Sequence, residues 1–227
     1  MSLFDILYPR TCPFCGRYIS RQQIHEEHIE WLCTKCWGRL PRTEQDRLRQ
    51  NSTEDLFPGI ERAAAYLFYE KDHTIQQVIH RMKYADQPEL GYWMGRQAVL
   101  DWRDEAFFDG IDLIISMPLH PRRMRERGYN QSEYIARGIS EITGIPVDTT
   151  HVTRVRYTPK QALQDGEERK TNVAGAFEVN HPEQLYHKHL LVVDDLITTG
   201  ETMKACLHAM RVCRGARISV FALCRAR

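Results

Sequence analysis

Two adjacent carboxylates, Asp194 and Asp195, follow directly on LLVV, the most apolar stretch of the sequence. Each of two close carboxylates raises the cost of ionising the other, so such a pair indicates that a ligand shares its site. The turn after them, LITTGET, adds three hydroxyl groups and a glycine that lets the backbone approach a ligand, at Thr198, Thr199, Gly200 and Thr202. Backbone amides at a helix start bind phosphate, and carboxylates accept hydrogen bonds from a diol. The combination predicts a site for ribose 5-phosphate; the alternative is an acidic strand end that only caps the next helix.

Four cysteines near the start of the chain form two pairs, CPFC and CTKC, with seventeen residues between them. They are Cys12, Cys15, Cys33 and Cys36. This spacing is typical of a tetrahedral zinc site, and a module of this size buries too little surface to fold without its metal. Because four sulfur ligands leave no open position, we predict a structural zinc. Redox chemistry at one pair is the alternative, and we take His25 and His28 between the pairs as surface residues.

Length and composition limit the functional classes. The 227 residues suffice for one ordinary domain with a small appendage, and 31 basic against 30 acidic residues leave a formal net charge of +1. The net charge therefore gives no overall electrostatic attraction to nucleic acid, and any such contact must come from a local patch of basic residues. No apolar run reaches the roughly 18 residues of a membrane span, and the first residues do not read as a signal peptide. We expect a cytoplasmic protein.

Strands and helices alternate over most of the chain. The pattern predicts strands at 63–69, 111–119, 146–150, 189–195 and 216–225, and helices at 72–84, around Trp93, from about Asn130 and over Met203–Met210. This order implies an α/β fold with an open, mostly parallel sheet, in which ligands bind beyond the carboxyl ends of the strands. We divide the chain into a zinc-binding module, residues 1–45, and an α/β domain, residues 46–227.

A basic segment, HPRRMRERGYNQ, follows the strand at 111–119 and so should lie at the ligand end of the sheet. Guanidinium groups suit pyrophosphate oxygens, and Arg123 and Arg127 are our first candidates. The alternatives are a solvated face or a patch that touches nucleic-acid phosphates. We take His120 and His151 as structural residues and leave open whether Lys83 and Tyr84 only cap a helix end.

The motif VVDDLITTGET resembles the phosphoribosyl pyrophosphate (PRPP) signature of type I phosphoribosyltransferases. Over its whole length the chain resembles the ComF family, through the cysteine pairs and the blocks IHRMKY, PLHPRRMRERGYNQ and RKTNVAGAF. The family combines a double zinc ribbon with a type I phosphoribosyltransferase-like domain. Its best-known members are competence proteins needed for the uptake of transforming DNA, and the domain is similar to that of amidophosphoribosyltransferases.

The resemblance implies a PRPP site and a reaction. The residues that would bind PRPP are Asp194, Asp195, Leu196, Ile197, Thr198, Thr199, Gly200, Thr202, Arg123 and Arg127, with Asn130 and Gln131 at the ribose or the entering group. A nitrogen nucleophile would displace pyrophosphate at C1′, with Asp194 and Asp195 stabilising an oxocarbenium-like transition state and magnesium bridging the pyrophosphate and ribose oxygens. A flexible loop at residues 157–177 would close over the site, with contributions from Lys160, Arg169 or Lys170.

The resemblance also implies partners and an alternative. The expected partners are PRPP and either single-stranded DNA or proteins of DNA uptake and recombination; it gives no oligomeric state. The alternative to a working transferase is a PRPP-sensing or DNA-handling module without turnover, in which the zinc ribbon is the surface that binds partners.

Overall fold

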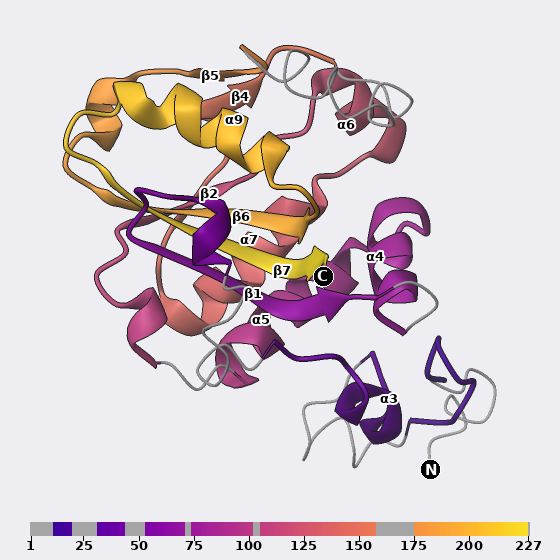
Figure 1. The fold of residues 1–227 in the computed structure, drawn as a ribbon. Coiled ribbons are helices and arrows are strands. Elements are labelled where there is room, and N and C mark those ends of the chain that lie inside the picture. Colours follow the sequence, from indigo (N-terminus) through magenta and orange to yellow (C-terminus); the bar gives the residue numbers. More distant parts are fainter. Residues whose placement is uncertain are drawn as a thin grey trace.

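A five-stranded parallel sheet forms the centre of the protein (Figure 1). The computed structural model describes residues 11–19, 31–43, 53–70, 74–101, 105–157 and 175–226. In the order of the sheet, the strands are β1 (Arg62–Tyr69), β7 (Arg217–Ala226), β6 (His189–Ile197), β2 (Leu113–Ser116) and β3 (Val147–Asp148). Every neighbouring pair is parallel. The predicted α/β class and open, mostly parallel sheet are confirmed.

Helices cover both faces of this sheet, which explains why β6 is an unbroken apolar run. One face packs against three helices, α4 (Thr74–Tyr84), α5 (Pro88–Asp101) and α7 (Gln131–Thr143). The other face packs against α9 (Glu201–Ala209). Side chains alternate along β6, so Leu191 and Val193 join the first cluster while Leu190 and Val192 join the second.

The crossing of α5 and α7 depends on two glycines. A Cβ atom added at Gly138 would lie 2.0 Å from the carbonyl oxygen of Tyr92, and one added at Gly95 would lie 2.2 Å from that of Ile135. The two backbones therefore meet directly, and no other residue type fits at either position.

Two elements have no counterpart among the helices and strands predicted from the sequence. Residues 121–127 form the helix α6 (Pro121–Arg127), and β4 (Val152–Arg154) pairs with β5 (Phe177–Val179) in an antiparallel ribbon. The helix has ordinary start and stop signals, because the ring of His120 accepts a hydrogen bond from the amide of Arg122 and Gly128 ends the helix at φ 83°. Short 3₁₀ turns complete the described elements, at Glu54–Leu56, Glu105–Phe108, Pro182–Leu185 and Met210–Val212.

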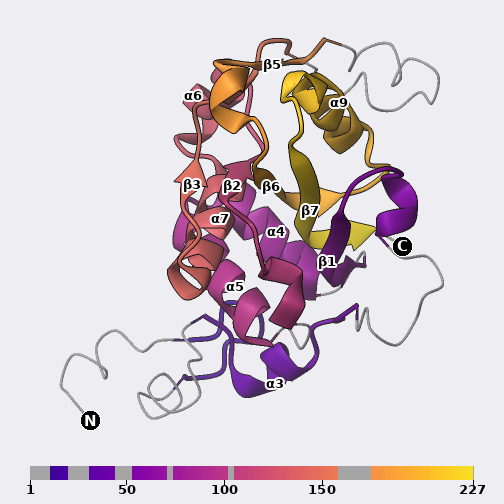
Figure 2. The ribbon, with the colours of Figure 1, turned by 90° about the vertical axis from the view of Figure 1, so that its left-hand side faces the viewer.

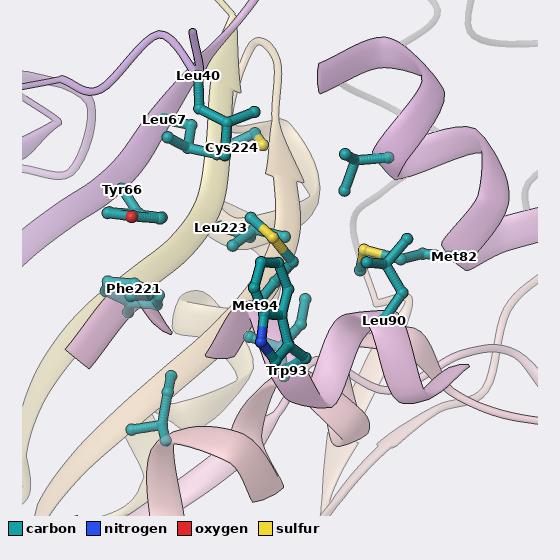
Figure 3. Packing of buried hydrophobic residues seen from close by; sticks show 14 of the residues in the cluster. Leu40, Tyr66, Leu67, Met82, Leu90, Trp93, Met94, Phe221, Leu223 and Cys224 are labelled. Atoms are coloured by element: carbon teal, nitrogen blue, oxygen red, sulfur yellow. The ribbon is translucent and has the colours of Figure 1, made fainter. Parts of the chain in front are cut away.

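The cysteine-rich module packs on the α5 side of the molecule, away from α9 (Figure 1 and Figure 2). Its short helix α3 (Thr34–Gly38) brings the Trp37 ring to 5.1 Å from the ring of Trp93 on α5. The chain then runs alongside β1, where the amide of Thr43 donates to Tyr66. Figure 3 shows Leu40 of this segment close to residues of β1 and β7, so the module shares one core with the sheet. Within the described ranges, no helix has the length and apolarity needed to cross a membrane.

Candidate functional site

The four cysteines of the two predicted pairs converge on one point. Their sulfur atoms all lie within 4.8 Å of one another, and those of Cys15 and Cys33 are 3.6 Å apart. Thiolates bound tetrahedrally to zinc at about 2.3 Å have this separation, so the donor set fits a closed structural zinc site. The backbone N–H of Arg17 helps to lower the pKa of the Cys15 thiol to about 7, which favours the thiolate that a metal needs.

The acid pair lies near the carboxyl end of β6, which continues to Ile197, two residues beyond the predicted end of this strand. The arrowheads of β1, β6 and β7 point to the side of the sheet where α4 and α6 also lie (Figure 1). There, Asp194 and Asp195 line a cavity of about 310 Å³. Both are nearly buried, with 9% and 4% of their surface exposed. We call this cavity the phosphoribose cavity, after the ligand that the sequence predicts for it.

Lys83, at the end of α4, is the counter-ion of the pair. Its Nζ lies 2.7 Å from Oδ2 of Asp195. Burial acts to lower the pKa of Lys83, but the charge and hydrogen bond of Asp195 oppose it, and the pKa lies above its ordinary value. The open question about Lys83 is thus answered, because this lysine contacts the acid pair.

Asp194 is held in a different way. Its Oδ1 accepts hydrogen bonds from the hydroxyl of Ser132 at 3.0 Å and from the amide of Asp195 at 2.8 Å. Burial, with the charge of Asp195 added to it, nevertheless raises the pKa of Asp194 from 3.8 to about 7. Burial and the neighbouring carboxylate thus both disfavour the ionised form of Asp194.

The threonine turn forms the floor of the phosphoribose cavity. The lining includes Leu196, Ile197, Thr198, Thr199, Gly200 and Thr202. Gly200 adopts φ 78° at the N-cap of α9, where a Cβ atom would also press on the ring of Phe57 at 3.2 Å. The strand end, the left-handed turn and the start of α9 thus direct amides and hydroxyls into one space that suits a phosphate.

Two arginines of the basic segment reach the same cavity. Arg123 and Arg127 both line it, and Arg127 donates to the side chain of Gln131, which lines it too. The amide of Asn130, by contrast, is used within the fold: it donates to the carbonyl of Met117 and accepts from the amide of Ser132. In this structure Asn130 orients the start of α7, and its predicted contact with ribose stays a prediction.

A second, larger cavity of about 880 Å³ adjoins the first and shares Lys83, Tyr84, Arg123 and Arg127 with it. Arg125, Tyr129 and Tyr157 also line this basic groove, together with the acids Asp86 and Glu126. The guanidinium of Arg127 lies 5.6 Å from the centre of the Tyr84 ring. The groove thus combines positive charge with aromatic faces.

Three residues of the site were not among the predicted site residues: Lys83 lies in the block IHRMKY, whereas Ser132 and Arg154 lie outside the motifs. Lys83 and Ser132 hold the acid pair, and Arg154 on β4 lines the phosphoribose cavity. A lysine at a helix end or an arginine in a short strand is too common to single out. The predicted loop residues Lys160, Arg169 and Lys170, like His25 and His28, lie outside the described residues.

Both histidines taken as structural contact neighbouring groups. His120 caps α6, as described above. His151 lies 2.8 Å from the carboxylate of Asp148 and 3.0 Å from the side chain of Gln184. Neither histidine lines either of the two cavities.

Comparison with known families finds both parts of the chain. Residues 3–47 match a double zinc ribbon domain and residues 130–227 match a phosphoribosyl transferase domain. The exact boundary between residues 45 and 46 stays a prediction.

Known proteins match over almost the full length. The DNA utilization protein YhgH of Salmonella typhimurium is 32% identical over 217 residues, 94% of this chain and 83% of that protein. Competence protein F of Haemophilus influenzae is 25% identical over 221 residues, 96% of this chain and 86% of that protein. Among solved structures, a purine phosphoribosyltransferase from Pyrococcus horikoshii has a TM-score of 0.36 at 13% identity, covering 59% of this chain and 84% of that one.

Proposed function

The chain belongs to the ComF family, and from this premise we propose that it binds PRPP with magnesium in the phosphoribose cavity and acts in the cytoplasm in DNA utilization or competence. The observation that carries the proposal is the buried acid pair directly before the threonine turn, inside one cavity of about 310 Å³. Carboxylates for a diol and amides for a phosphate lie there at opposite ends of one short segment. The names of the relatives support the cellular role.

In this proposal each group of the cavity has one task. The turn at Thr198–Thr202 and the start of α9 hold the 5-phosphate, while Asp194 and Asp195 accept hydrogen bonds from the ribose hydroxyls. Arg123 and Arg127 hold the pyrophosphate as bidentate cations. Hard oxygen donors and two acids are the surroundings that magnesium prefers, and bound with the pyrophosphate it would neutralise the charge of the leaving group.

Transfer of the phosphoribosyl group to a nitrogen nucleophile is the reaction that this arrangement would support. Positive charge develops on the ribose ring as pyrophosphate leaves, and the two carboxylates are placed to stabilise it. Ionised Asp194 stabilises this charge better than its protonated form, so a ligand that favours ionisation would also favour the reaction. The protein supplies position and electrostatics, and no nucleophile of its own is needed.

Calorimetric titration of the zinc-loaded protein with PRPP and magnesium tests the proposal. Binding should be lost or weakened at least tenfold in Asp194→Asn and in Asp195→Asn, and should not change in Glu178→Gln, which removes an exposed acid of β5. If the wild-type protein binds, release of pyrophosphate in the presence of candidate nucleophiles distinguishes a transferase from a sensor. No binding by the folded wild-type protein would refute the proposal.

A DNA-handling module without turnover is the second candidate, and the basic groove favours it. Single strands bind to grooves where cations follow the backbone and aromatic rings stack on bases, and the groove holds both kinds of side chain. Arg125 lines the groove and not the phosphoribose cavity. If the groove binds single-stranded DNA, Arg125→Ala should weaken that binding for all sequences and reduce its salt dependence, with PRPP affinity unchanged.

A further inference from the structure

Arg154 is a cation of the phosphoribose cavity that no motif assigns. It is the last residue of β4 and lies in register with Phe177 on β5. Its guanidinium carbon is 5.4 Å from the centre of the Phe177 ring, which supports the side chain from one side without offering an oxygen acceptor. Arg154 lines the cavity together with Asp194 and the threonine turn.

One nitrogen of the Arg154 guanidinium lacks an acceptor in the described structure. This nitrogen, Nε, is buried and has no hydrogen-bond partner within the part of the chain that the structure describes. Lys83, another cation of the same cavity, has the carboxylate of Asp195 at 2.7 Å. A buried donor without an acceptor is unfavourable, and native proteins rarely tolerate one unless a ligand or water completes it.

The electrostatics of the cavity agree with this geometry. Burial lowers the pKa of Arg154 and the positive charge of Arg123 lowers it further, although the negative charge of Asp194 opposes both. Arginine stays charged in proteins, so the lowered pKa means that the fold holds the charged Arg154 in an environment that disfavours its charge. Asp195 is already paired with Lys83, and Asp194 makes its hydrogen bonds with Ser132 and the backbone. The acids of the site therefore do not complete Arg154.

We propose that Arg154 binds a phosphate group of the ligand in the phosphoribose cavity, and that this phosphate supplies the acceptor that its Nε lacks. The inference rests on the proposed function, because it adds a binding residue to the same cavity. A guanidinium fork matches two phosphate oxygens, and a ligand with a 5-phosphate and a pyrophosphate offers several. Arg154 is then the third arginine of the site, after Arg123 and Arg127.

Calorimetry on the full-length, zinc-loaded protein tests this role with three probes: PRPP with magnesium, ribose 5-phosphate, and inorganic pyrophosphate. Arg154→Met should weaken PRPP binding about tenfold to a hundredfold, the loss that follows from one charge-assisted pair. Arg154→Lys keeps the charge without the fork and should lose less. Arg156→Met is the matched control, since Arg156 is exposed, lies two residues further along and lines neither cavity. The simpler probe whose affinity also falls identifies the phosphate that Arg154 contacts.

Thermal melting of the ligand-free proteins separates binding from a structural role. If Arg154 serves a ligand, Arg154→Met removes a half-buried cation whose Nε has no acceptor and should leave the melting temperature unchanged or raise it. A lower melting temperature would mean that Arg154 supports the fold, and unchanged PRPP affinity would mean that it does not bind; either result overturns the inference.

The same experiments distinguish the inference from the proposed function. If the wild-type protein binds pyrophosphate or ribose 5-phosphate through Arg154 but does not bind PRPP, the proposed function is wrong and the role of Arg154 stands. If it binds PRPP equally well with and without Arg154, the proposed function stands and the inference is wrong. If it binds none of the probes, both are wrong.

Discussion

Replacing Asp194 by asparagine is expected to stabilise the ligand-free protein, although it removes a residue of the proposed site. Burial raises the pKa of Asp194 from 3.8 to about 7. The folded state therefore binds a proton at this carboxyl more tightly than the unfolded chain does. The stability contributed by the protonated form is complete below pH 4 and is lost as the pH rises to about 7 and above.

The size of the effect follows from the shift. A rise in the pKa of Asp194 from 3.8 to about 7 corresponds to about 4 kcal/mol of unfolding free energy. The wild-type protein has this stabilisation at low pH, where Asp194 is protonated, and has lost it at pH 8. Asparagine keeps an oxygen that can accept from Ser132 and from the amide of Asp195, so these hydrogen bonds survive. Its new amide group needs an acceptor, which offsets about 1–2 kcal/mol if none is found. We expect Asp194→Asn to be about 2–3 kcal/mol more stable than the wild type at pH 8.

Urea unfolding of the zinc-loaded proteins between pH 5.5 and pH 8 measures the difference in unfolding free energy between Asp194→Asn and the wild type. The advantage of Asp194→Asn should grow by about 1.4 kcal/mol per pH unit up to pH 7 and then level off. Asp195→Asn is the contrasting variant, because it leaves Lys83 beside the site without its partner at 2.7 Å and should lose stability. An Asp194→Asn protein that is less stable than the wild type at pH 8, or a difference that does not change with pH, would refute the reasoning.

Three further outcomes are expected. Lys83→Met should lower the unfolding free energy at pH 8 by about 2–4 kcal/mol and weaken PRPP binding, because the acid pair loses its counter-ion; Lys204→Met, which removes an exposed lysine of α9, is the control in the same urea titration. Gly138→Ala should lower the unfolding free energy by more than about 3 kcal/mol or prevent folding, because its Cβ would lie 2.0 Å from the carbonyl oxygen of Tyr92. Gly38→Ala is the control: its Cβ would meet no atom within 4 Å, and its circular dichroism spectrum should be that of the folded wild type. Removing the metal with a chelator should unfold the cysteine module and expose the tryptophan pair that it shares with α5, so tryptophan fluorescence should shift to the red and return when zinc is added; an unchanged spectrum would contradict a structural zinc.

The sequence was informative where chemistry and local structure use the same residues. Asp194 and Asp195 end an apolar run and precede a turn with glycine, so strand, turn and helix start could all be predicted from one short segment. The cysteines were equally clear, because their spacing is itself the geometry of the site. Helix α6 could have been predicted as well from Pro121 and Gly128, but its arginines were given more weight than its capping residues.

Contacts between distant segments could not be predicted in this way. Lys83 meets Asp195 only because α4 ends at the carboxyl edge of the sheet, and that placement depends on how α4 and α5 pack on β1 and β7. Arg154 lines the cavity because β4 pairs with β5. This ribbon is short, and its sequence has no run of alternating apolar and polar residues long enough to predict it. Both are ordinary residues in ordinary positions, and only the fold gives them chemistry.

The cavity unites charges that the fold alone would not favour. Asp194 is buried with a raised pKa, and Arg154 has a buried donor without an acceptor. Each lowers the stability of the empty protein, and each would gain a partner from a ligand with a diol and phosphates. Lys83 is the exception, since without it two adjacent carboxylates would have no cation within hydrogen-bonding distance in the described structure. A strand end that only capped α9 would need neither the buried Asp194, nor the unpaired donor of Arg154, nor the ion pair with Lys83. Their presence together in one cavity supports the proposed binding site over a strand end that only caps the next helix.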